Sequence, residues 1–396
     1  MNPISHGGNM TAVRRRYGLG NLPMIDFSVS LNGLGAPKGA MAAAYKANAK
    51  IERYPEPGAL RLTERVAEFH GVPTECVIVG AGTTELISLI AASLRDVLAQ
   101  HAQELGDPRM AMSHLIEPCY AEYRRASTLN NLRVDVHKTH IIGWEQDYFP
   151  KQASGINWTG HPNNPTGRAW DRKTLLDHVD ASGALLTVVD EAYLAFLPDE
   201  AERTLCGDVV NRDNLMVMRS MTKIYSIAGL RVGYALASPE MVDRLKRFQD
   251  PWTITVPAEL AAVECLNDDE YIEETRGIVI EESERMFDAL WDIPGLRPAW
   301  PGRERPEDAA GFPNFLLVSL TDTPWTSVQV HEAMARRGVL IRECSNYAGL
   351  EMGSILTGPG LEVLTKGHLR FAVRCREEND RLLEALESVM KSQPPR

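Results

Sequence analysis

Short apolar runs alternate with helical patterns through the middle of the chain, and this alternation constrains the fold more than any other feature. The runs that read as buried strands are CVIVG, MSHLI, LRVDV, INWTG, LLTVVD, LMVMRS and VGYALA. Helical patterns lie between them, at 84–94, 120–129, 171–182 and 239–248. This alternation favours a mostly parallel sheet that is covered by helices on both faces. The sequence therefore predicts an α/β fold.

The length predicts more than one domain, because 396 residues exceed one typical core. Residues 1–50 have weak periodicity and many glycines, so we expect an N-terminal arm that contributes to the small domain and the substrate site. We expect a large domain over 51–293. Pro- and Gly-rich breaks at 294–313 precede a second set of strands and helices, which predicts a smaller C-terminal domain over 294–396.

Composition and charge exclude several classes of protein. The net charge of −11 gives no reason to expect a nucleic-acid partner, and no run approaches the length of a membrane span. The N-terminus lacks the build of a signal peptide. The six cysteines are scattered and form no CxxC pair, which indicates free thiols in a reducing cytoplasm.

The stretch RSMTKIYSIAGLRVGYAL, residues 219–236, places Lys223 between apolar strands, where a lysine must be paired or have its pKa lowered. Ser220, Thr222 and Arg231 surround this lysine with two hydroxyls and a guanidinium, which together suit a phosphate group. An amine beside a bound phosphate indicates a Schiff-base lysine and pyridoxal phosphate.

This interpretation requires an acid that faces the ring nitrogen of the cofactor. Asp190 ends the apolar run LLTVVD, which is a typical place for a ligand-facing carboxylate in an open α/β sheet. Tyr193, three residues later, is a candidate partner of the ring's phenolic oxygen. A plain helix N-cap is the alternative role for Asp190.

Three further segments supply candidate contacts. GAGTTE, residues 80–85, lies between a strand and a helix, whose N-terminus offers free N–H groups to a phosphate. HPNNPTG, residues 161–167, places Asn164 where it can donate to the phenolic oxygen, although it also reads as a simple turn. Tyr120 follows another strand and is either a ring-stacking residue or part of the core.

Taken together, GAGTTEL, HPNNPTG, VVDEAY, SMTKIYSIAGLRVGY and HLRFAVR occur in the order that is typical of one family. The chain resembles the fold-type I pyridoxal-phosphate enzymes of the aspartate aminotransferase superfamily over nearly its whole length. The resemblance implies a large domain with a mostly parallel sheet of seven strands and a smaller α+β C-terminal domain. It implies an enzyme, either a pyridoxal-phosphate-dependent decarboxylase or an aminotransferase, acting on a small amino acid.

The resemblance also implies residue roles. Lys223 carries the cofactor, Asp190 pairs with the pyridine nitrogen, and Asn164 and Tyr193 hold the ring oxygen. Tyr120 stacks on the ring. The expected phosphate contacts are Gly82, Thr83, Thr84, Ser220, Thr222 and Arg231. Tyr54, in RYPEPG, resembles a tyrosine that reaches the phosphate of the neighbouring subunit, which implies a homodimer with shared active sites.

Three stretches narrow the expected reaction: SHGGN (5–9), DFSVSLNGLG (26–35) and VLIRECSNYAGL (339–350). They resemble threonine-phosphate decarboxylases of cobalamin biosynthesis and, less closely, histidinol-phosphate aminotransferases. This implies decarboxylation of an O-phospho amino acid, with transamination of a histidinol-phosphate type or of another pathway's amino acid as the alternative. His6, Arg342 and Arg370 become the expected anion partners, and Asn32 is expected near the substrate carboxylate.

The chain departs from that subfamily at two places. Ser30 and Gly33 stand where the decarboxylases have asparagine and proline, and the segment 351–367 is longer than the usual connection. That segment lies between Arg342 and Arg370, so these differences bear on the substrate more than on the cofactor.

Three other classes of protein fit the sequence less well. A transcriptional regulator with an aminotransferase-like sensor would need a DNA-binding module, and the first 50 residues are not basic enough to suggest one. His137 and His140 have a spacing that metal ligands use, but no third ligand is in view, so we expect no metal. A catalytically silent binding protein does not require the complete set of catalytic residues that this chain carries.

Overall fold

A seven-stranded sheet forms the centre of the larger domain in the computed structural model, which describes residues 7–104, 106, 112–138, 155–299, 311–358 and 361–395. The strand order is β2-β8-β7-β6-β5-β3-β4. Strand β8 runs antiparallel to both of its neighbours, and the pairs from β7 to β4 are parallel. The strands are β2 (Val77–Gly80), β3 (Met112–Glu117), β4 (Arg133–Lys138), β5 (Ile156–Gly160), β6 (Leu186–Asp190), β7 (Leu215–Ser220) and β8 (Gly233–Ala237). Each apolar run that predicted a strand forms one of them, so the mostly parallel sheet is confirmed.

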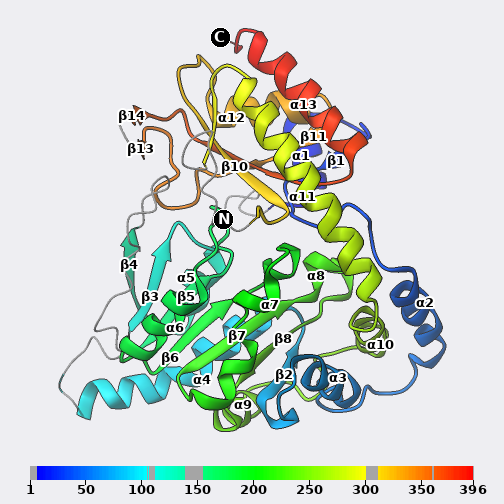
Figure 1. Cartoon of the computed structure of the whole chain (residues 1–396), viewed down its shortest axis with the longest axis vertical. Coiled ribbons are helices and arrows are strands. Elements are labelled where there is room, and N and C mark those ends of the chain that lie inside the picture. The colour runs from blue at the N-terminus through cyan, green and yellow to red at the C-terminus, as the bar shows by residue number, and fades with distance from the viewer. Residues whose placement is uncertain are drawn as a thin grey trace.

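Helices cover both faces of this sheet, as the alternation predicted (Figure 1). One face packs against α4, α5 and α9, and the other against α3, α6 and α10. The bounds are α3 (Leu60–His70), α4 (Thr83–Glu104), α5 (Ala121–Leu129), α6 (Arg172–Ala181), α7 (Glu200–Arg203), α8 (Met221–Ile224), α9 (Pro239–Lys246) and α10 (Val256–Cys265). The strands are apolar on both sides because neither face meets water.

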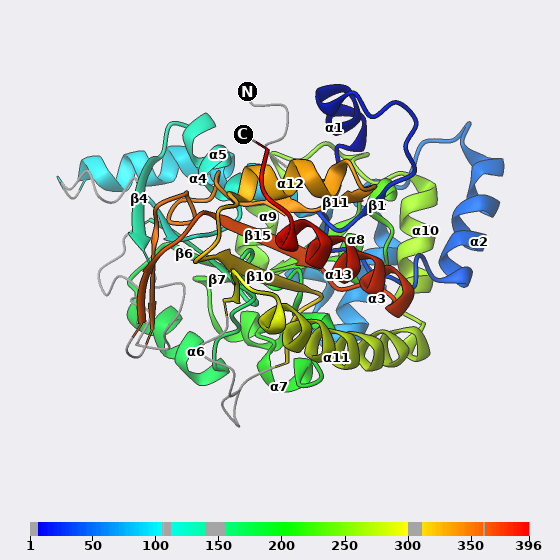
Figure 2. The same ribbon diagram turned by 90° about the horizontal axis from the view of Figure 1, so that it is seen from above.

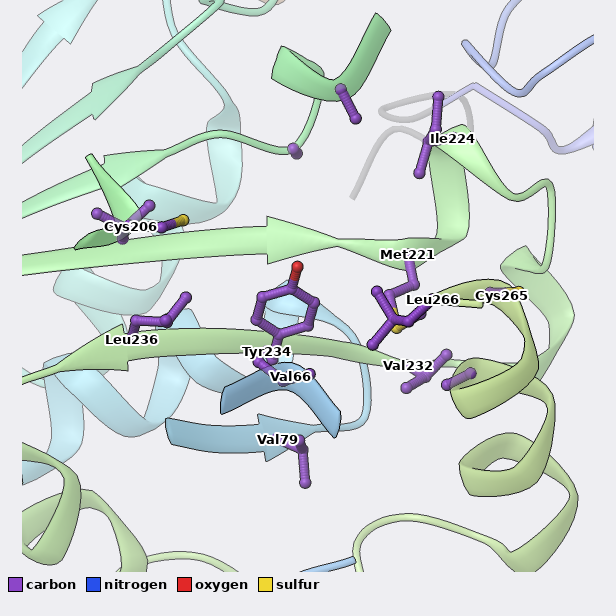
Figure 3. Packing of buried hydrophobic residues seen from close by; sticks show 14 of the residues in the cluster. Val66, Val79, Cys206, Met221, Ile224, Val232, Tyr234, Leu236, Cys265 and Leu266 are labelled. Carbon is purple, nitrogen blue, oxygen red and sulfur yellow. The ribbon is translucent and has the colours of Figure 1, made fainter. Parts of the chain in front are cut away.

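The core on the α3 and α10 side of the sheet shows how this burial works. Tyr234 and Leu236 of β8 lie beside Val79 of β2, and Val66 of α3 covers them (Figure 3). These side chains are at most 3% exposed. Because successive residues of a strand point to opposite faces, Ala235 and Ala237 belong to the core on the other side.

The smaller domain is built on an antiparallel sheet in the order β12-β15-β10-β9. Its two central strands, β15 and β10, are labelled in Figure 2. Its elements are β9 (Leu296–Pro298), β10 (Phe315–Leu320), α12 (Ser327–Ala335), β11 (Val339–Leu340), β12 (Arg342–Glu343), β13 (Ile355–Gly358), β14 (Leu361–Leu364), β15 (His368–Ala372) and α13 (Arg376–Lys391). Helix α11 (Asp269–Asp292) belongs to both cores, because Val279 packs in the large domain while Met286 and Leu290 pack in the small one. The expected domain boundary after residue 293 thus follows directly on this shared helix.

The first 50 residues divide between the two domains. Helix α1 (Met10–Tyr17) places Val13 against Ala335 and Leu340, and β1 (Ile25–Asp26) pairs in parallel with β11. Helix α2 (Lys38–Ala47) packs on α10 instead, with three small side chains, Ala40, Ala44 and Ala47, buried. Small residues at this spacing let the two helices approach closely. The first 50 residues therefore contribute to both the small and the large domain.

The segment 351–367 contains the two-stranded β13–β14 hairpin, which pairs with no other strand of the described chain. Among the described residues, no helix is both long and apolar enough to cross a membrane.

Candidate active site

A cavity of about 180 Å³ lies where the carboxyl ends of the large sheet's strands meet, the usual position for a ligand in an open α/β fold. It collects residues from the turn after β2, the ends of β5, β6 and β7, and the start of α8. The sequence-predicted residues that line it are Gly82, Thr83, Thr84, Tyr120, Asn164, Asp190, Tyr193, Ser220, Thr222, Lys223 and Arg231. Tyr54 is the predicted cofactor residue that does not line it.

One corner of the cavity is rich in donors that suit a phosphate. Helix α4 begins at Thr83, and its first N–H groups have no partner within the helix. Ser220 Oγ and Thr222 Oγ1 lie 2.8 Å apart in the same cavity. Arg231 donates to the Ala228 carbonyl and adds a positive charge. A dianionic phosphate fits this combination of helix dipole, hydroxyls and guanidinium.

Gly82 keeps this corner open. Its φ of +79° lies in the left-handed region, and an added Cβ would stand 2.5 Å from Nη2 of Arg231. The turn therefore needs glycine both for its backbone conformation and for the space that the arginine occupies.

Asp190 supplies a buried negative charge at the end of β6. Its carboxylate accepts hydrogen bonds from Tyr123 Oη at 2.7 Å and from the Ala192 N–H at 3.0 Å. Burial raises the pKa of Asp190, while these hydrogen bonds and the nearby charge of Lys223 oppose the rise. A protonated pyridine nitrogen is a fitting partner for such a carboxylate.

Tyr123 was not among the residues predicted from the sequence. Its ring stacks on Trp158 at a centroid distance of 5.2 Å and an interplanar angle of 14°, which holds the hydroxyl on Asp190. The one sequence signal was its spacing of three from Tyr120, which directly precedes α5 and meets the Tyr123 ring edge to face at a centroid distance of 5.7 Å. The contact with Asp190 spans 67 positions and depends on the tertiary fold.

Lys223 carries an amine prepared for nucleophilic chemistry. Burial, together with the charges of Arg370 and Arg231, lowers the pKa of Lys223 from 10.5 to about 8, and Asp190 opposes this shift. The neutral form of the amine, which attack on a carbonyl requires, is therefore far more populated near physiological pH than in a lysine with its ordinary pKa.

Asn164 and Tyr193 present donors to the opposite side of the cavity. Arg370 Nη1 and, at 3.4 Å, Tyr347 Oη donate to Asn164 Oδ1. Because arginine can only donate, this contact leaves the Nδ2 group of Asn164 available for a ligand oxygen. Burial raises the pKa of Tyr193, so its hydroxyl stays protonated and can donate as well.

Two arginines stand side by side in the small-domain sheet, and Arg370 contacts Asn164 at the cavity wall. Arg342 of β12 and Arg370 of β15 are directly opposite in the antiparallel sheet, so their side chains share one face, and both are 5% exposed. Arg370 Nη2 donates to the Ser28 carbonyl at 3.0 Å. Arg342 donates to Asn346 Oδ1 at 2.7 Å and lies over the ring of Tyr347. Arg342 lines a separate small cavity with Gly7, Gly8 and Ser28.

The remaining predicted residues lie elsewhere. Asn32 does not line the cavity, because its Nδ2 donates to the Ile224 carbonyl and to Thr275 Oγ1, and its Oδ1 accepts from the Leu34 N–H. It supports the loop of the lysine instead, since its backbone N–H donates to the Lys223 carbonyl. His6 lies outside the described residues. Tyr54 is 81% exposed and packs on Trp252.

Comparison with known proteins places these features in one family. Residues 23–386 match the sequence profile of the family described as Aminotransferase class I and II. The threonine-phosphate decarboxylase of Salmonella typhimurium is 29% identical over 99% of this chain and 98% of its own length. The histidinol-phosphate aminotransferase of Symbiobacterium thermophilum is 31% identical over 98% of this chain and 96% of its own length.

A solved structure shares the fold. The L-threonine-O-3-phosphate decarboxylase from Porphyromonas gingivalis superposes with a TM-score of 0.75 at 23% identity, covering 92% of this chain and 99% of that one. The donors around the cavity, the lysine with a lowered pKa and the buried aspartate all fit the same cofactor. This chain is therefore a member of the class I and II aminotransferase family and a pyridoxal-phosphate-dependent enzyme.

Proposed function

We propose that this enzyme decarboxylates a small O-phosphorylated amino acid of the threonine-phosphate type. The observation that carries the proposal is the buried pair formed by Arg342 and Arg370, of which Arg370 contacts Asn164 at the wall of the cofactor cavity. Two fixed guanidinium groups suit a substrate that carries two anionic groups, a carboxylate and a phosphate. The full-length likeness to a threonine-phosphate decarboxylase supports the same choice.

The chain's own groups would hold the cofactor as follows. Lys223 would bind its aldehyde carbon and Asp190 would face its ring nitrogen, while Tyr123 holds that carboxylate by a hydrogen bond. Asn164 and Tyr193 would donate to the ring oxygen. When bound, pyridoxal phosphate supplies a protonated ring that withdraws electrons from whichever bond of the substrate α-carbon stands perpendicular to it.

The arginines then decide the reaction by orientation. Arg370 contacts Asn164 at the cavity wall, and Arg342 lies opposite it on the neighbouring strand, so the two would offer separate anchors for the two anions of the substrate. Anchors that hold the substrate carboxylate in the position of the bond to be broken would favour loss of carbon dioxide. Lys223 would supply the proton that replaces it on the α-carbon, a role for which a pKa of about 8 is suitable.

Transamination of a histidinol-phosphate type of substrate is the second candidate. It would use the same cavity, but the neutral amine of Lys223 would remove the α-proton instead of supplying one. The full-length likeness to a histidinol-phosphate aminotransferase favours this alternative. The β13–β14 hairpin lies between the two arginines in the sequence and is a candidate source of a different substrate preference.

The proposal includes a homodimer in the cytoplasm. The exposed Tyr54 would reach the phosphate corner of the partner's cavity, which completes two shared active sites. The six cysteines are free thiols, which supports a reducing compartment.

One incubation tests the proposed reaction. Purified holoenzyme is mixed with O-phospho-L-threonine without any keto acid, and carbon dioxide release is followed together with the cofactor spectrum. We expect many equivalents of carbon dioxide per enzyme, with the starting spectrum restored once the substrate is consumed. Unphosphorylated L-threonine serves as the matched control and should react far more slowly, because it leaves one arginine without its anion.

The other outcomes are equally informative. One equivalent of pyridoxamine phosphate without carbon dioxide would contradict decarboxylation and establish transamination, which histidinol phosphate with a keto acid would then confirm. Lack of any response would contradict an O-phosphothreonine substrate. Lys223→Ala should abolish turnover with every substrate, and substantial activity in that variant would refute the role assigned to the lysine.

A further inference from the structure

Three side chains of types that can bind a metal ion meet at the β4 edge of the large sheet, and none of them lines the cofactor cavity. His114 of β3 pairs in register with Asp135 of β4, and His137 follows two positions later on β4. Side chains two positions apart on a strand share a face, so all three project to the same side of the sheet.

The distances among the three ligating atoms are nearly equal. His114 Nδ1 lies 3.2 Å from His137 Nε2 and 3.4 Å from Asp135 Oδ2, and His137 Nε2 lies 3.3 Å from Asp135 Oδ2. Donors held about 2.0–2.1 Å from one tetrahedral zinc ion stand about 3.3 Å from one another. An octahedral ion with bonds of similar length would bring neighbouring donors to about 3 Å.

We propose that His114, Asp135 and His137 form a binding site for a tetrahedral divalent metal ion of the zinc class, with water in the fourth position. Two imidazole nitrogens and one carboxylate oxygen are a ligand set that zinc accepts readily. In the sequence, His137 and His140 have a spacing that metal ligands use. The structure brings His137 together with His114 and Asp135 instead, and His114 lies on another strand, so the sequence spacing could not identify it. His140 itself lies outside the described residues.

The surroundings suit an ion with access to solvent. The side chains of His114 and His137 are 7% and 19% exposed, while that of Asp135 is 44% exposed and provides the route of entry. Asn157 of β5 lies in register beside His114. It is 2% exposed, and neither polar atom of its side chain has a hydrogen-bond partner in the described structure. A buried, unpartnered amide is typical of a position where an ordered water or an ion completes the bonding.

A bound metal ion would link the edge strand β4 to its neighbour β3. Strand β4 is the last strand of the order and pairs only with β3 in the described chain. A metal ion that takes one ligand from β3 and two from β4 links the two strands through their side chains. Metal binding to the folded form alone would stabilise the protein by mass action.

Zinc binding to the chelator-treated holoenzyme tests the site. We expect one zinc ion per chain by isothermal titration calorimetry, a rise in the melting temperature, and a tetrahedral visible spectrum with Co²⁺. Asp135→Asn and His137→Gln should each weaken zinc binding more than about tenfold, since loss of even an outer-shell partner can cost that much. His101→Gln, on helix α4 and outside the triad, is the matched control and should bind zinc like the wild type.

Three results would overturn the site: no zinc binding by the wild type, unchanged binding in both triad variants, or an octahedral cobalt spectrum. The first would leave the three side chains as a hydrogen-bonded group. Both substitutions keep the size of the side chain nearly constant and lie on an edge strand, and an unchanged cofactor spectrum will report that each variant is folded.

Discussion

At the scale of single residues, Lys223 is placed for chemistry at the expense of stability. Burial and two neighbouring arginines lower its pKa from 10.5 to about 8, whereas an unfolded chain restores the ordinary value. Holding this amine protonated in the cofactor-free fold therefore costs at most roughly 3–4 kcal/mol, and less where water in the cavity screens it. We expect Lys223→Met to raise the free energy of unfolding of the cofactor-free protein at pH 7.

The pH dependence gives the sign of this effect. Below pH 8 the amine is protonated in both states, so the full cost is present. Between pH 8 and 10.5 the unfolded chain binds the proton that the folded chain has lost, so wild-type stability rises and the advantage of the variant shrinks. Urea unfolding of the wild type and of Lys223→Met at pH 7 and pH 10 measures the free energy of unfolding of each protein and the difference between them. Lys173→Met, at a side chain that is 82% exposed, is the control. A Lys223→Met variant less stable than the wild type at pH 7 would contradict the argument.

At the scale of elements, the turn from β2 into α4 joins backbone geometry to cofactor binding. Gly82→Ala would add left-handed strain and would also push Arg231 away from the phosphate corner. We expect cofactor affinity to fall at least about tenfold, or roughly 1.4 kcal/mol, because a charge-assisted contact is lost. Gly183→Ala adds similar strain at a φ of +62° with no atom within 4 Å, so it should lower stability by roughly 1 kcal/mol and leave cofactor affinity unchanged. Spectroscopic titration of the wild-type and variant apoenzymes with pyridoxal phosphate measures these affinities. A Gly82→Ala variant that binds the cofactor as tightly as the wild type would refute the role of the turn.

The elements also show what the sequence could and could not predict. Strand β6 and the role of its last residue were predictable from the sequence. The apolar run shows that the strand is buried, and its end at Asp190 places a carboxylate at the carboxyl end of the strand, where ligands bind. The pairing of β1 with β11 and the antiparallel direction of β8 were not, because an apolar pattern identifies a buried face without naming its partner. The same limit explains Tyr123 and Asn32, whose roles depend on contacts with residues far away in the chain.

At the scale of the whole molecule, the exposed apolar surface supports the proposed homodimer. Large apolar side chains are exposed on two neighbouring segments: Met41, Tyr45, Ile51, Tyr54, Phe248 and Trp252. The segments are joined by a hydrogen bond from the Gly58 N–H to the Pro251 carbonyl and by the packing of Tyr54 on Trp252. A second copy of the chain is the occupant that the proposed shared active site requires.

Two substitutions distinguish the formation of the proposed dimer from the proposed hydrogen bond between Tyr54 and the partner's cofactor phosphate. Trp252→Asp should place a charge in the proposed interface, convert the dimer to a monomer in size-exclusion chromatography with light scattering, and release the cofactor. Tyr54→Phe should leave the dimer intact but weaken cofactor binding about tenfold, because it removes one hydrogen bond to a charged phosphate. A wild-type protein that is monomeric yet fully active, or a Tyr54→Phe variant with unchanged cofactor affinity, would show that each cavity works without its neighbour.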